Sequence, residues 1–126
     1  MAYIGTADWA TAPARQVEPT VQLRDERRAD GSHLLLWAYL DTLGRLHIDG
    51  QDLGPVTRFV SGDGEYEYFK MVAKEDIPRL VEILGGEPGD EILGLLGREW
   101  TGDKSYDLEA VLRDGPIEVV LATWRG

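Results

Sequence analysis

The segment from residue 33 to residue 49 constrains the fold most, because it predicts a β-hairpin whose register follows from its turn. A three-residue loop at 42–44 ends in a glycine, which tolerates the left-handed conformation that such a turn needs. The loop sets Asp41 opposite Arg45, and residues equally distant from the turn then face each other. Side chains alternate along a strand, so one face of the hairpin is apolar throughout: Leu34, Leu36, Ala38, Leu40, Leu46 and Ile48.

The opposite face of the hairpin is aromatic with polar tips. We expect either that another element covers this face or that the face is a binding surface. Its members are Leu35, Trp37, Tyr39, His47 and Asp49.

The rest of the chain predicts an α+β domain with two layers. Period-two alternation and β-branched runs indicate strands at about 19–26, 65–72 and 117–124, besides the two strands of the hairpin. Helical spacing indicates helices at about 77–84, 89–100 and 104–113, and one helical turn near 56–60. The order β-β-β-β-α-α-α-β predicts a mainly antiparallel sheet of about five strands with three helices on one face. The pattern leaves open which strand the last one pairs with.

The domain organisation is expected to be simple. Hydrophobic residues make up 43% of the 126-residue chain, which is enough for one domain with its own core, assigned to residues 17–126. Residues 1–16 show no clear period and are expected to form a loosely ordered lead-in, from which Tyr3, Ile4 and Trp9 could still dock on the domain.

Composition excludes several classes of function. The net charge of −10 argues against nucleic acid and anionic membranes as partners, and favours a basic protein. Cysteine is absent, which removes disulfides, thiolate metal sites and cysteine nucleophiles. The sequence contains neither a signal-peptide pattern nor a run of roughly 20 apolar residues, so we expect a cytoplasmic protein.

Motifs for catalysis or for metal binding do not emerge from the sequence. The two histidines, His33 and His47, are not expected to share a metal, and the acidic clusters at 49–52 and 63–65 lack the ligand spacing of a calcium loop. Phosphate loops, nucleophile elbows and zinc-protease motifs are missing from the chain. We therefore expect no catalytic residue, no metal and no cofactor, and keep an enzyme built on His47 with Asp49 as a third alternative.

The run EYEY at residues 65–68 is the most unusual local feature. As a strand it presents two carboxylates on one face and two phenols on the other, which together suit contacts with a basic protein. The predicted partner-binding residues are therefore Trp37, Tyr39, His47, Asp49, Glu65, Tyr66, Glu67 and Tyr68.

The run from Leu40 to Val72, with IDGQDLGP and GDGEYEY, followed by LVEILGG at Leu80 to Gly86, resembles a small bacterial domain family of no established activity. This resemblance implies no catalytic residues. In size, acidity and α+β character the chain is also similar, as a class, to the immunity proteins that neutralise bacterial polymorphic toxins.

These observations lead to two expectations of function. The first is a non-enzymatic interaction domain, most plausibly an immunity protein that binds a basic toxin. The alternative is a small-molecule-binding module with an aromatic pocket between sheet and helices, lined by residues such as Trp37, Tyr39 and Trp124.

Overall fold

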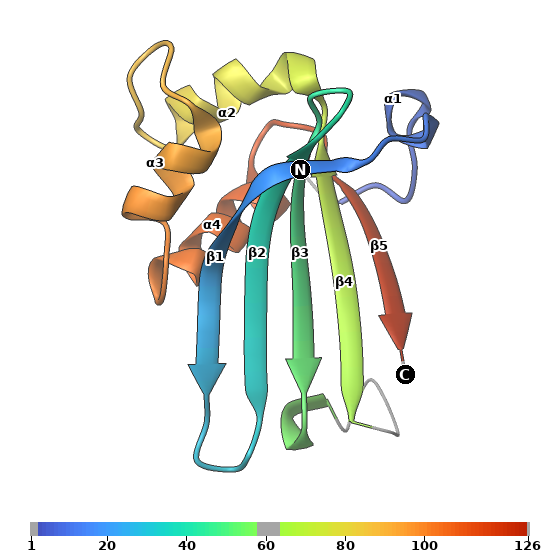
Figure 1. Cartoon of the computed structure of the whole chain (residues 1–126), viewed down its shortest axis with the longest axis vertical. Helices are drawn as coiled ribbons and strands as arrows, with labels where there is room; N and C mark the ends of the chain where they lie inside the picture. The colour runs from blue at the N-terminus through green and yellow to red at the C-terminus, as the bar shows by residue number, and fades with distance from the viewer. Residues whose placement is uncertain (1–2, 58–63, 126) are drawn as a thin grey trace.

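The computed structural model describes residues 3–57 and 64–125, which form a five-stranded sheet and several helices (Figure 1). The strands are β1 (Gln16–Arg27), β2 (His33–Asp41), β3 (Leu46–Leu53), β4 (Glu65–Val72) and β5 (Val120–Arg125). The helices are α1 (Asp8–Thr11), α2 (Ile77–Ile83), α3 (Ile92–Glu99) and α4 (Lys104–Asp114), with 3₁₀ turns η1 (Pro55–Thr57) and η2 (Lys74–Asp76).

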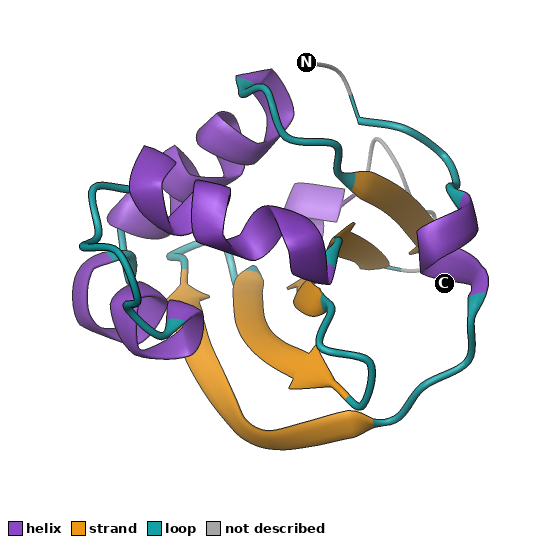
Figure 2. Cartoon of the chain, turned by 90° about the horizontal axis from the view of Figure 1, so that it is seen from above, coloured by secondary structure: helices purple, strands orange, loops and turns teal. Residues whose placement is uncertain are grey.

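The sheet is antiparallel throughout, with its strands in the order β1-β2-β3-β4-β5. The predicted α+β class is thus confirmed, and the strand left unplaced by the sequence pairs with β4. Helices α2, α3 and α4 lie on one side of the curved sheet (Figure 2). We call the other side the open face, because α2, α3 and α4 leave it uncovered; the short helix α1 lies only at its end, where the carbonyl of Trp9 accepts a bond from Arg45.

The hairpin of β2 and β3 has the predicted register. Asp41 donates its N–H to the carbonyl oxygen of Arg45 at 3.1 Å, and Gly44 has a positive φ of 79° at the end of the loop. Leu40 faces Leu46 in the ladder, so the predicted apolar residues all point toward the helices. Burial of this face against α2, α3 and α4 forms the core, whose largest fully buried side chains include Leu23, Leu36, Leu46, Ile48, Leu80, Leu95, Leu96 and Leu108.

The ends of the later elements differ from the sequence prediction. Helix α3 begins at Ile92 rather than near residue 89, because Gly89 has a positive φ of 88° and Glu91 caps the helix. The Glu91 carboxylate accepts the N–H groups of the second and third helical residues, which would otherwise lack partners. Of the helical turn expected at 56–60, the 3₁₀ turn η1 accounts for the start, and residues 58–60 lie outside the described residues.

The N-terminal segment is docked rather than loosely ordered over its described part. Ile4 forms a parallel bridge beside β5, donating to the carbonyl of Val119 at 3.0 Å and accepting from the N–H of Leu121 at 2.8 Å. Trp9 donates its indole N–H to the Glu118 carboxylate at 2.6 Å. The segment then crosses the end of the open face near the β2–β3 turn and enters β1 (Figure 1). It therefore covers one end of the predicted aromatic surface, whereas Leu35 and Trp37, farther from the turn, stay partly exposed.

Candidate functional site

The open face is a grid of side chains from four strands in register. One row runs from Trp37 on β2 through Asp49 on β3 to Phe69 on β4. A second row places Gln51 beside Glu67, and Glu67 beside Trp124 on β5. The strands therefore bring most of the predicted partner-binding residues to one surface.

Two large aromatic side chains on the open face are exposed to solvent. Phe69 is 38% exposed and Trp124 is 50% exposed. They are diagonal neighbours, since Phe69 faces Ala122 and Trp124 is the next residue of β5 on the same side. Neither ring is part of the hydrophobic core, so the part of the open face around Phe69 and Trp124 is accessible to a partner.

The same end of the open face is acidic. The side-chain amide of Gln51 donates to Oε1 of Glu65 at 2.9 Å and to Oε1 of Glu67 at 3.3 Å. One amide thus holds two carboxylates beside Trp124, where they present negative charge next to an exposed ring.

Asp49 lies at the centre of the open face but is only 6% exposed. Tyr39 donates its hydroxyl to Oδ2 of Asp49 at 3.0 Å, while Oδ1 has no partner within the described residues. Burial raises the pKa of this carboxyl above its usual value, because the charged form loses hydration. Asp49 is therefore a buried hydrogen-bond partner of Tyr39, and a protein on the open face would not contact it directly.

His47 does not act with Asp49, which corrects the pairing expected for an enzyme. The His47 ring stacks on Tyr39 with centroids 4.7 Å apart, and its Nε2 bonds to Oδ2 of Asp41 at 2.7 Å. Burial alone would raise the pKa of Asp41, but hydrogen bonds from His47 and Arg45 outweigh it and hold the pKa below its usual value. At the end of the open face near the β2–β3 turn, Tyr39, Asp41, Arg45 and His47 thus form a polar network that stabilises the hairpin.

Tyr66 and Tyr68 do not belong to the open face, although both were predicted as partner-binding residues. The alternation of EYEY holds as predicted, so Glu65 and Glu67 point to the open face while the two tyrosines point toward α4. Tyr68 is 8% exposed, and its ring lies against the backbone of Gly50. A protein docked on the open face would not touch either phenol.

The alternative expectation was also wrong about its residues. Trp37, Tyr39 and Trp124 lie on the open face and not between the sheet and the helices. A concave site between sheet and helices does exist, and we call it the tyrosine groove. It has a volume of about 460 Å³ and is lined by Tyr3, Tyr66, Tyr68, Lys70, Tyr106 and Glu109, with Arg113 and Leu121 at its sides.

An ion cluster of Arg24, Lys70 and Glu109 adjoins the tyrosine groove: Lys70 and Glu109 line the groove, and Arg24 lies behind them. Arg24 is 3% exposed and donates from Nη2 to Oε1 of Glu109 at 2.6 Å, while Lys70 is 5% exposed and pairs with Oε2. Arg24 also donates from Nε to the Ser105 hydroxyl at 2.9 Å. Burial lowers the pKa of Lys70, although the charge of Glu109 opposes that shift.

The tyrosine side chains of the groove are held by this cluster and by α4. Tyr3 donates its hydroxyl to the backbone carbonyl of Glu109 at 3.3 Å, and burial raises its pKa to about 12. The Lys70 Nζ lies 4.3 Å from the ring centroid of Tyr68, and the Arg24 guanidinium lies 3.6 Å from that of Tyr106. Concave shape and shifted titratable groups together mark a candidate binding site.

The sequence pattern missed this groove because its members come from four separate segments. Alternation in β1 put Arg24 opposite to Leu23, but a register shift between Gln22 and Arg24 lets both Leu23 and Arg24 be buried. The sequence did contain one indication: Lys70 lies on the same strand face as Tyr66 and Tyr68, and a buried lysine is nearly always paired with an acidic side chain.

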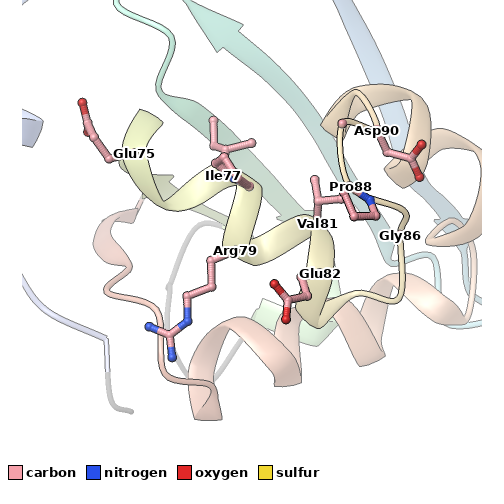
Figure 3. Close-up of a pocket in the computed structure, with 10 residues that line it drawn as sticks. Glu75, Ile77, Arg79, Val81, Glu82, Gly86, Pro88 and Asp90 are labelled. Atoms are coloured by element: carbon pink, nitrogen blue, oxygen red, sulfur yellow. The ribbon is translucent and has the colours of Figure 1, made fainter.

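A second depression, of about 490 Å³, lies along α2 and the loop that follows it (Figure 3). Figure 3 shows that Glu75, Arg79 and Glu82 spread outward along the helix, while Asp90 lies at the far end. Because these side chains do not converge on a common point, the depression offers no defined binding geometry.

Within residues 3–57 and 64–125, no three His, Asp or Glu side chains are grouped as they would be to hold a metal ion. Among the helices of the same residues, none has the length and apolar character needed to cross a membrane. Finally, no protein family model, no curated protein and no solved structure matches this chain.

Proposed function

We propose that this chain is a non-enzymatic interaction domain that binds a basic protein through the open face of its sheet. One observation carries the proposal: Phe69 and Trp124 are exposed beside the paired carboxylates of Glu65 and Glu67. Aromatic side chains anchor interfaces, and a surrounding acidic rim selects partners of opposite charge.

The charge of the whole molecule supports a basic partner. At a net charge of −10, the chain repels other acidic proteins and draws basic ones toward it over several ångströms. Such steering raises the association rate more than it raises the final affinity. An inhibitor that must reach a toxin quickly benefits from this property, so a basic toxin met in the cytoplasm is the partner that we propose.

The test compares variants of the open face with matched variants of the helical side. Phe69→Ala removes an aromatic ring that is 38% exposed on the sheet, and Ile83→Ala removes an apolar side chain of equal exposure on α2. The tagged proteins serve as bait in a lysate of the source cells at about 0.1 M and about 1 M salt, between which the Debye length falls from about 10 Å to about 3 Å. Captured proteins are identified by mass spectrometry, and the affinity of the isolated partner is then measured.

We expect wild type and Ile83→Ala to retain one basic protein at low salt and to lose most of it at high salt. Phe69→Ala should bind that protein about 30-fold more weakly, the loss typical of an interface hot spot. Glu67→Lys should slow its association, whereas Glu82→Lys on α2 should change the rate much less. An empty capture, an acidic partner, or equal binding by the Phe69 and Ile83 variants would each contradict the proposal.

A further inference from the structure

We infer that the tyrosine groove binds a small planar carboxylate, with Lys70 holding the carboxylate group and the planar body packing against the tyrosine side chains that line the groove. The groove opens between β4, β5 and α4, on the helical side of the sheet. It is therefore separate from the open face, and the inference does not depend on the proposed protein partner.

The ammonium group of Lys70 has N–H bonds without a partner among the described residues, which favours a ligand that carries a hydrogen-bond acceptor. Lys70 has three N–H bonds and pairs with one carboxylate oxygen of Glu109, its only acceptor in the part of the chain that the structure describes. The hydroxyl of Tyr68 lies toward Gly50 and accepts a bond from Arg24 at 3.4 Å, so Lys70 rather than Tyr68 is the donor that faces the groove. Each oxygen of Glu109 already accepts one bond, from Arg24 or from Lys70, so a ligand carboxylate in the groove would give the remaining N–H bonds of Lys70 a second acceptor.

The local charge favours an anion despite the acidity of the whole chain. Two buried cations, Arg24 and Lys70, share the single carboxylate of Glu109. Besides Glu109, the charge of Asp52 acts on Lys70, and burial raises the pKa of Asp52, which favours its neutral form. Glu26 accepts a bond from the Tyr106 hydroxyl at 2.8 Å and does not bond to Lys70. A buried cluster with two cations and one anion gains from a second anion, because charges interact strongly where water is excluded.

The shape and lining of the groove favour a flat body behind that carboxylate. Its volume of about 460 Å³ falls within the usual range for small-molecule sites and exceeds what a bare carboxylate would fill. Tyr66 and Tyr68 stand with ring centroids 5.7 Å apart, and Leu121 adds an apolar surface. Offset aromatic contacts with such rings suit an aromatic acid. A cationic ligand is disfavoured, because Lys70 and Arg24 already occupy the faces of Tyr68 and Tyr106.

Benzoate is the probe for this site, with benzamide as the uncharged molecule of the same shape. Binding to the whole chain is measured by isothermal titration calorimetry, and the tyrosine ring resonances are followed by NMR. Lys70→Met removes the ammonium group and keeps roughly the length of the side chain. The control Lys104→Met removes the ammonium group of a lysine on α4 whose side chain is 56% exposed. Leu121→Trp fills the groove from β5, where residue 121 faces Lys70, and keeps Arg24, Lys70 and Glu109 themselves; it serves if Lys70→Met does not fold.

We expect benzoate to bind wild type and Lys104→Met alike, and to bind at least about tenfold more weakly to Lys70→Met, as when a charge-assisted hydrogen bond is lost. Leu121→Trp should also lose the binding, and benzamide should bind much more weakly than benzoate. The inference is overturned if wild type shows no saturable binding of benzoate, if benzamide binds as well, or if neither Lys70→Met nor Leu121→Trp weakens the binding.

Discussion

Replacing Gly50 with alanine is expected to destabilise the fold, because the Tyr68 ring occupies the space that a Cβ atom needs. The new Cβ would lie 2.1 Å from Cζ of Tyr68 and 2.3 Å from Cε2, well inside the contact distance of about 3.5–4.0 Å. The ring must therefore move by about 1.5 Å, and with 8% exposure it has little room to do so.

The size of the effect follows from what the ring can lose. Overpacking that shifts a buried side chain costs about 1–3 kcal/mol. Complete expulsion of a tyrosine that buries about 150–250 Å² would cost about 4–6 kcal/mol, which is the upper limit. Alanine regains about 0.5–1 kcal/mol over glycine in a strand through the lower entropy of the unfolded chain. We expect Gly50→Ala to lower the free energy of unfolding by about 2 kcal/mol, within the range that these costs and this gain allow.

Urea unfolding measures this change, and a thermal scan should show the melting temperature lower by about 8 °C for a chain of this length. Gly94→Ala on α3 is the matched control, since the nearest atom to its new Cβ is an oxygen of Glu91 at 3.4 Å. That variant should gain about 0.5–1 kcal/mol. In a Tyr68→Ala background, Gly50→Ala should cost nothing, because the obstructing ring is gone. An unchanged cost in that background would refute the reasoning, as would a Gly50→Ala protein as stable as wild type.

Two further predictions concern the buried charges and phenols. Glu109→Gln should lower the free energy of unfolding by about 3–5 kcal/mol, because Arg24 and Lys70 would stay buried without their counter-charge. The control Glu99→Gln, on the exposed side of α3, should change the free energy of unfolding by less than about 0.5 kcal/mol. Equal urea midpoints for the two variants would argue against the ion cluster. Stability should also fall between about pH 10.5 and pH 12, because burial raises the pKa of Tyr3 to about 12 and also raises that of Tyr68, so the unfolded chain loses phenolic protons first. Urea unfolding at several pH values across this window measures the free energy of unfolding. A free energy that does not change with pH there would contradict the burial of these phenols.

The sequence was most informative where neighbouring residues determine the structure. The three-residue turn alone sets the register of β2 and β3, and period-two alternation places the carboxylates and phenols of EYEY on opposite faces of β4. Helices α2 and α4 also lie where their apolar spacing indicates, to within one or two residues.

The tyrosine groove was beyond such patterns, because they compare residues on one element only. Arg24 and Glu109 are 85 residues apart and meet only when α4 packs on the sheet. In a sequence pattern, Glu109 reads as one more polar residue on an exposed helix face. The bonding of His47 was missed for a related reason: the sequence suggested Asp49, two residues along the same strand, but the partner is Asp41 across the hairpin.

The pairing of β4 with β5 has a consequence for the order in which the chain can fold. Strands β1 to β4 each pair with the next strand along the chain, so these pairs can form as soon as they are synthesised. The free edge of β4 stays unpaired until α2, α3, α4 and β5 have been synthesised. During that time its unpaired backbone N–H and C=O groups can pair with strands of other chains. The bridge from Ile4 then shields part of the β5 edge in turn. Residues at the two ends of the described chain thus act together as the last step that protects the sheet from aggregation.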